Sequence, residues 1–145
     1  MPLKLSLKPG EKFVINGAVV VNGDRRASLI LQNRATILRE KDILTEKDVT
    51  TPARRIYFPI MMMYLDTENA QSYYDEFALR MTEFMNVVSN PDVLTQCVAV
   101  SRDVMAGQFY KALMKCRKVL AYEQERLPHV SEGLSEHAKA DRKSA

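Results

Sequence analysis

The sequence of 145 residues has no tryptophan and contains two cysteines and two histidines. Two cysteines cannot build a disulfide framework, and a zinc site needs more Cys or His at ligand spacing. Cys97 and Cys116 fall inside helical patterns, which predicts buried, reduced thiols. His129 and His137 lie in a polar stretch without other ligands nearby. We therefore expect no metal, no cofactor and no disulfide.

Long apolar runs are also missing. The longest, Phe58 to Leu65, is far shorter than the roughly 20 residues that cross a bilayer. The first twenty residues show no basic stretch followed by an apolar one, so no secretory signal is expected. With 46% apolar and 27% charged residues, the composition predicts a compact globular protein rather than a disordered chain. We expect a cytoplasmic protein that does not contact membranes.

Recognisable catalytic motifs are lacking as well. The chain has no Gly-x-Ser-x-Gly, no glycine-rich phosphate loop and no Cys-x-x-Cys. Its carboxylates fall on predicted helix surfaces; Asp75 and Glu76, for example, face away from the apolar stripe of their helix. We therefore expect a protein that is not an enzyme.

The chain does have an uneven distribution of charge. Residues 1–60 contain eleven Lys and Arg against six Asp and Glu, whereas residues 61–145 contain ten against twelve. A basic front half with a slightly acidic back half favours a polyanionic partner for the front half.

The front of the chain has the pattern of short β-strands. Residues 3–7 alternate apolar and polar side chains, Pro9-Gly10 forms a turn, and Asn16-Gly17 between "FVI" and "AVVV" is a strong hairpin signal. "SLILQ" and "TILR" supply two more strands. Residues 1–50 are thus predicted to form a small antiparallel β meander or half-barrel, too small to be stable without the helices or a second copy.

The back of the chain has the pattern of about three to four helices over residues 51–127. Thr51-Pro52 and Asn90-Pro91 are expected helix starts, and Gly107 a break. Pro59 leaves open either a kinked helix or two pieces. Residues 128–145 are expected to be a flexible tail. The predicted fold class is α+β, as one cooperative domain.

Arginine and lysine on the predicted turns and strand ends offer a surface for phosphate. The aromatic Phe13 stands alone before Tyr57, which argues against readout of bases by stacking. The alternative is ordinary surface charge, with ion pairs to Asp24, Glu40 and Asp42. The candidate RNA-binding residues are Lys4, Lys8, Lys12, Arg25, Arg26, Arg34, Arg39, Arg54 and Arg55.

The run Met61-Met62-Met63, followed by Tyr64, allows two interpretations. Methionine fills irregular gaps in cores, and it also lines adaptable binding surfaces. These four residues are therefore either core or a surface that binds a partner protein.

The sequence resembles the FlbT family of flagellar regulators. The resemblance covers nearly the whole chain and includes "LKPGEKFVINGAV", "LILQN", "ILREKDI" and "TPARRIYF". It implies a post-transcriptional regulator that binds the 5′ untranslated leader of flagellin messenger RNA and lowers its translation and stability during flagellum assembly. Some members of the family act as activators instead.

The resemblance also implies protein partners, namely a FlaF-type protein or flagellin itself. The alternative function is therefore a protein-interaction adaptor or chaperone-like factor of flagellar assembly that affects messenger RNA indirectly. Exposed edges of a short sheet further suggest a homodimer.

Overall fold

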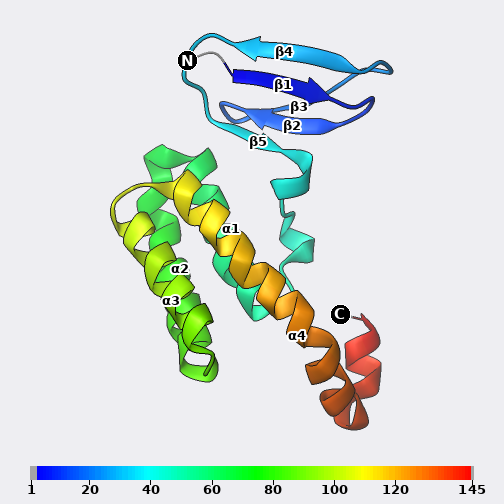
Figure 1. Cartoon of the computed structure of the whole chain (residues 1–145), viewed down its shortest axis with the longest axis vertical. Helices are drawn as coiled ribbons and strands as arrows, with labels where there is room; N and C mark the ends of the chain where they lie inside the picture. Colours follow the sequence, from blue (N-terminus) through cyan, green and yellow to red (C-terminus); the bar gives the residue numbers. More distant parts are fainter. Residues whose placement is uncertain (1–2, 145) are drawn as a thin grey trace.

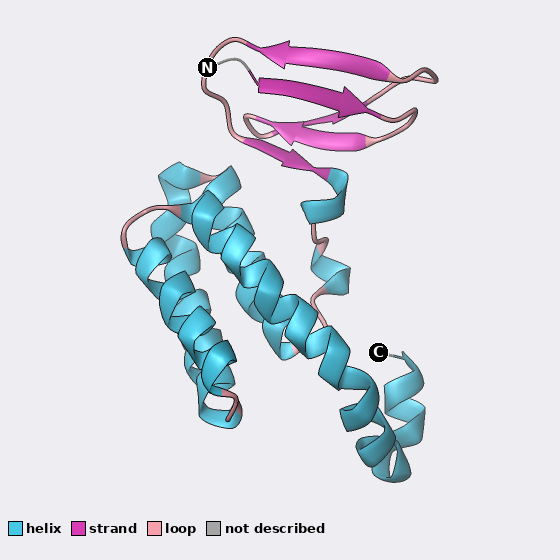
Figure 2. Cartoon of the chain, in the orientation of Figure 1, coloured by secondary structure: helices cyan, strands magenta, loops and turns pink. Residues whose placement is uncertain are grey.

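The computed structural model describes the backbone of residues 3–144 and the side chains of residues 3–126. Strands gather at one end of the molecule and helices at the other (Figures 1 and 2). The strands are β1 (Leu3–Leu7), β2 (Lys12–Ile15), β3 (Ala18–Val21), β4 (Ala27–Leu31) and β5 (Ile37–Arg39). Two 3-10 turns, η1 (Glu40–Asp42) and η2 (Glu46–Asp48), lead to the helices α1 (Pro52–Leu65), α2 (Ala70–Val87), α3 (Pro91–Met105) and α4 (Phe109–Ser144). The predicted α+β class is confirmed.

The β2–β3 hairpin forms where the sequence predicts it. Asn16 and Gly17 have φ angles of 49° and 83°, the left-handed values that a type I′ turn requires. Glycine adopts such angles without strain, and asparagine tolerates them better than most residues.

The strands form two small sheets rather than one continuous meander. β1 pairs with β4, and β2 lies between β3 and β5, with all pairs antiparallel. Four buried side chains, Leu5, Leu7, Phe13 and Ile37, lie outside the core of the helices and so form the core of the β region itself. Local signals such as Pro9-Gly10 predict a turn, but they do not specify whether the two strands beside the turn pair with each other. Here β1 and β2 belong to different sheets.

The helices begin at the predicted caps. The Thr51 side chain accepts a hydrogen bond from the Arg54 N–H, and the Asn90 side chain accepts from the Asp92 and Val93 N–H groups. Proline follows each cap, at a position where a missing N–H costs nothing.

The helices pack α1 against α2 and α4, and α3 against α4. Pro59 lies within α1, which remains one helix, so the two-piece alternative does not apply. Tight packing compensates for the lost backbone hydrogen bond, because Pro59 and its neighbour Ile60 are both buried. Gly107, with φ of 75°, makes the turn from α3 to α4 as predicted.

The backbone of residues 128–144 belongs to α4. The tail, residues 128–145, falls on residues whose side chains lie outside the described part of the chain, and its flexibility stays a prediction. Among the described residues, no helix is both long and apolar enough to cross a bilayer.

The β region joins the helices through β2, β5 and α1. Val14 and Leu38 belong to the same buried cluster as Ile56 and Ile60 of α1. The Tyr64 hydroxyl, near the end of α1, accepts from the Ile37 N–H and donates to the Ile37 carbonyl, both at 3.0 Å. One side chain thereby satisfies both backbone groups of Ile37 on the free edge of β5.

An ion pair ties β5 to the first turn. Glu11 accepts from the Lys8 N–H at 2.9 Å, and the Arg39 guanidinium lies 3.0 Å from the same carboxylate. Arg39 also donates to the Ser6 carbonyl of β1. The Lys8 N–H and, after it, the Arg39 guanidinium hold the pKa of Glu11 below its usual 4.5, although partial desolvation opposes them.

Replacing Tyr64 with phenylalanine is expected to lower the free energy of unfolding by about 1–3 kcal/mol. The Ile37 N–H and carbonyl are partly buried and would lose their hydrogen-bond partner. Urea unfolding of the parent and Tyr64→Phe measures this. Tyr73→Phe is the matched control, since the half-buried Tyr73 hydroxyl makes no hydrogen bond to the described part of the chain. Equal losses in both variants would contradict a specific role for Tyr64.

The stability that Glu11 contributes should depend on pH. Its folded-state pKa is lowered, so the contribution is present above the unfolded-state value of about 4.5 and is lost as the pH falls through the folded-state value. Glu11→Gln should therefore be less stable than the parent at neutral pH, and the difference should shrink below pH ~4. Urea unfolding across pH measures it, with the exposed Glu68→Gln as control. A difference independent of pH would contradict this account.

Candidate nucleic-acid interface

The two turns that carry Lys8, Arg25 and Arg26 lie at the same end of the β region. The Leu7↔Ala27 and Lys12↔Val21 pairs place the β1–β2 turn beside the β3–β4 turn. We call this the basic end. Its cationic residues are Lys8, Lys12, Arg25, Arg26, Arg39 and Lys41.

Asn22 holds these two turns together. Its side-chain amide donates to the Lys8 carbonyl at 2.7 Å and to the Arg25 carbonyl at 2.9 Å. The Gly10 N–H donates to the Asn22 carbonyl at 3.1 Å, and the Asn22 N–H donates to the Glu11 carbonyl at 2.9 Å. The Asn22 amide therefore holds the backbone carbonyls of Lys8 and Arg25 close together. No local pattern in the sequence marks Asn22 for this role, because its partners are set by which strands pair.

Most cations of the basic end have no acidic partner within the described part of the chain. Lys8, Lys12, Arg25 and Arg26 are exposed and form no ion pair there, whereas Arg39 pairs with Glu11. The predicted alternative of pairing with Asp24, Glu40 and Asp42 therefore does not describe these four residues. Free, exposed cations keep their donors available for phosphate oxygens.

A shallow groove runs between the first turn and η1. The residues that line it are Lys8, Pro9, Gly10, Glu11, Arg39, Glu40 and Lys41. Glu40 is occupied locally, because its carboxylate accepts from the Lys12 N–H at 2.7 Å. Lys41 was not among the predicted residues; its place in the groove depends on how β5 turns into η1. Asp24 and Glu40 also lie at the basic end, so its net charge is positive although it contains negative groups.

Four predicted cations lie elsewhere. Lys4 is exposed on β1 and pairs in register with Ile30 of β4. Arg34 lies in the β4–β5 connection, at the opposite end of the strands, where it shares a groove with Tyr64 and Lys111.

Arg54 and Arg55 lie at the start of α1, whereas Tyr64 contacts β5 near its end. Ten residues of helix place them about 15 Å from Tyr64 along the axis of α1. Arg54 lines a cavity with Lys41, beside the groove rather than on the two turns. The two turns and the strand ends next to them therefore carry Lys8, Lys12, Arg25, Arg26 and Arg39, whereas Arg54 and Arg55 belong to α1.

The basic end offers phosphate contacts rather than base stacking. Phe13, the aromatic residue nearest in the sequence, is 3% exposed and belongs to the core of the β region. Bases would stack on an exposed ring, so contact with a phosphate chain through charge is what this surface supports.

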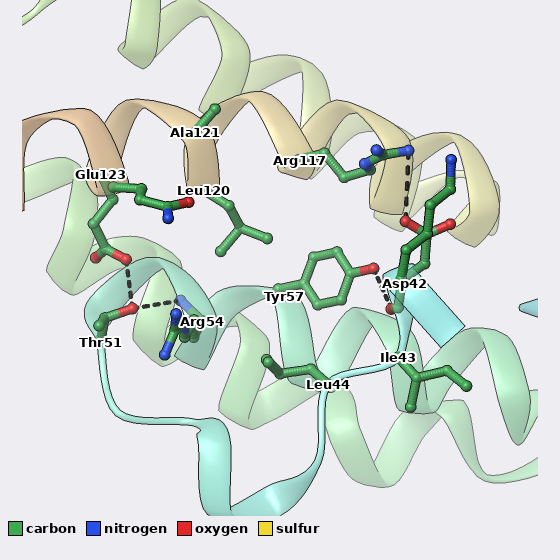
Figure 3. Close-up of a pocket in the computed structure, with 12 residues that line it drawn as sticks. Asp42, Ile43, Leu44, Thr51, Arg54, Tyr57, Arg117, Leu120, Ala121 and Glu123 are labelled. Atoms are coloured by element: carbon green, nitrogen blue, oxygen red, sulfur yellow. Dashed lines mark hydrogen bonds and ion pairs between the residues drawn. The ribbon is translucent and has the colours of Figure 1, made fainter. Parts of the chain in front are cut away.

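A second cavity, of about 300 Å³, lies between the η1 segment, α1 and α4 (Figure 3). Its acidic residues are already occupied. Tyr57 donates to the Asp42 backbone carbonyl at 2.6 Å, Arg117 lies 3.5 Å from the Asp42 carboxylate, and Glu123 accepts from the Thr51 hydroxyl. Burial, with Asp42 nearby, raises the pKa of Tyr57 and keeps its hydroxyl protonated. These groups connect the linker and two helices.

The methionine run lies largely in the core. Met61 and Met63 are buried, and the Met61 sulfur accepts from the Leu44 N–H at 3.4 Å. Met62 and Tyr64 are half-buried, and Tyr64 is held by β5. The side chains of Met61 and Met63 thus fill the core, and a partner protein at the surface would not contact them.

Both cysteines are buried and unpaired, as predicted. Burial raises the pKa of Cys97 to about 11, so the thiolate is scarce at neutral pH. Within the described residues, no group of three His, Cys, Asp or Glu side chains is placed to hold a metal ion.

Comparison with known proteins places the chain in a family. The family model described as "Flagellar protein FlbT" matches residues 3–127. The chain is 69% identical over 131 residues to a probable flagellum biosynthesis repressor protein FlbT of Caulobacter sp. (strain K31), which covers 90% of this chain and 100% of that protein.

Two further relatives carry similar names. The flagellum biosynthesis repressor protein FlbT of Caulobacter vibrioides (strain ATCC 19089 / CIP 103742 / CB 15) is 66% identical over 93% of this chain and 96% of its own length. A probable flagellum biosynthesis repressor protein FlbT of Rhodopseudomonas palustris (strain TIE-1) is 38% identical over 88% and 98%. No solved structure matches the chain. Because the family match covers most of the sequence, this chain belongs to the FlbT family of flagellar proteins.

Proposed function

We propose that this protein represses flagellum biosynthesis by binding the 5′ untranslated leader of flagellin messenger RNA through the basic end of its β region. The names of its relatives support the repressor role. The observation that supports RNA as the target is the set of exposed cations, Lys8, Lys12, Arg25 and Arg26, held on two joined turns without acidic partners in the described part of the chain.

The mode of binding follows from this geometry. Four unpaired cations contact successive phosphates of a single-stranded or looped leader, and each contact releases bound counterions. The logarithm of affinity should then fall with the logarithm of salt concentration with a slope of about −3, from about −0.7 for each contact. Sequence preference would come from the shape of the leader, because no exposed aromatic ring of the basic end is available to stack on bases.

Repression through a protein partner is the competing function. An adaptor of flagellar assembly, working with a FlaF-type protein or flagellin, would not require the basic end to bind RNA. Purified protein that fails to bind the leader but retains a flagellar partner would favour this function.

Removing charge from the basic end should weaken leader binding. The variant Lys8→Ala, Arg25→Ala, Arg26→Ala is expected to bind about 100-fold more weakly, at about 1 kcal/mol for each exposed charge-assisted contact. Its salt slope should become shallower by about 2. Fluorescence anisotropy with a labelled leader, repeated across salt concentrations, measures both quantities.

The matched control removes three exposed cations from other elements, as Lys47→Ala, Arg102→Ala, Lys118→Ala. This control should change affinity by less than about threefold, because its charges lie outside the basic end. Similar losses in the two triple variants would mean that binding depends on overall charge and not on this surface.

Asn22 should affect leader binding by positioning Lys8 and Arg25, since its own side chain carries no charge. Asn22→Ala removes the amide that holds Lys8 beside Arg25, and we expect leader affinity to fall about tenfold while the salt slope is unchanged. The exposed Asn33→Ala is the control. A lower slope in Asn22→Ala would show that phosphate contacts are lost outright. Unchanged affinity would show that the turns need no such clamp.

A further inference from the structure

Four strands of the β region have one side without a partner strand among the described residues, because only β2 has a neighbour on both sides. Two of them, β3 and β4, are considered first: β3 pairs only with β2, and β4 pairs only with β1. β4 is the outermost strand, on the side of the β region away from the helices (Figure 1). We call the second sides of β3 and β4 the open edges.

The open edges carry exposed branched apolar side chains. Val19 is 69% exposed, Val21 is 57% exposed, and Ile30 of β4 is 60% exposed. Val19 and Val21 share one face of β3, because side chains alternate along a strand. Exposed β-branched residues on a strand with free backbone donors and acceptors form a template for another strand.

The other edges of the two sheets are protected, whereas these are not. Tyr64 bonds both backbone groups of Ile37 and so blocks one end of the edge of β5, and β1 carries the exposed Lys4. No charged residue or proline occurs from Phe13 to Gly23 or from Ala27 to Asn33. Natural sheets discourage pairing with charges, prolines or bulges, and the sequences of β3 and β4 contain neither a charge nor a proline.

We propose that two copies of this chain associate through the open edges of β3 and β4, related by a two-fold axis. An edge without charge is complementary to itself, since a second copy meets neither a like charge nor an unpaired ion there. Antiparallel pairing of identical strands also sends the Arg25-Arg26 turns of the two copies to opposite ends, which keeps their positive charges apart. Where the proposed function holds, the dimer presents two basic ends to one RNA.

The test measures molar mass by sedimentation equilibrium on the full chain without RNA, so its outcome is independent of RNA binding. The parent is expected to have twice the mass of the 16.5 kDa chain. The edge variant, Val19→Lys, Val21→Lys, Ile30→Lys, should be monomeric, because like charges then face each other across the edge. The control Leu79→Lys, Val87→Lys, Val98→Lys changes three exposed apolar residues of α2 and α3 by the same charge and should remain dimeric.

A mixing experiment separates lost association from lost folding. A second edge variant with glutamate at positions 19, 21 and 30 should also be monomeric alone, and should form a mixed dimer with the lysine variant, since opposite charges then meet. A monomeric parent, or an edge variant that stays dimeric, would overturn the proposal. If the two edge variants stay monomeric when mixed, pairing at this edge is likewise excluded.

Discussion

The packing of β2 and β5 against α1 is the interaction on which the rest of this protein depends. Four buried side chains, Leu5, Leu7, Phe13 and Ile37, are too few to hold five short strands together in water. Val14 and Leu38 therefore extend the helical core into the sheet, and Tyr64 bonds both backbone groups of Ile37 in β5. The helices thus supply the rigid base from which the turns of the β region project.

The turns at the basic end are held without the charged side chains of Lys8, Arg25 and Arg26. Asn22 fixes both turns with its amide, and the Glu11–Arg39 pair ties β5 to the first turn at their base. Both devices use only backbone groups of Lys8 and Arg25. These cations remain close to one another without compensation, an arrangement that is unfavourable for the free protein and favourable when an anion binds. This separation of structural and exposed charge is what makes the basic end a candidate for RNA.

Local features of the fold were predictable because their physics is local. Asn16-Gly17 fits a turn with positive φ, and Asn90-Pro91 satisfies a helix start within four residues of chain. Pro59 was ambiguous, because its effect depends on whether neighbouring helices hold α1 together, which they do. The pairing of β1 with β4 was not predictable, since it joins residues twenty or more positions apart and neither segment carries a signal that identifies its partner.

Residue order alone established the α+β class, the helix caps, the basic front half and the likeness to the FlbT family, since each rests on composition or on neighbours in the chain. Folding decided which charges act together. Lys8 and Arg25 meet because the strands pair as they do and Asn22 spans the gap, whereas Arg54 lies at the far end of a helix. Folding likewise placed Met61 and Met63 inside the core. Distances between segments remote in the chain depend on packing, and no short-range pattern encodes them.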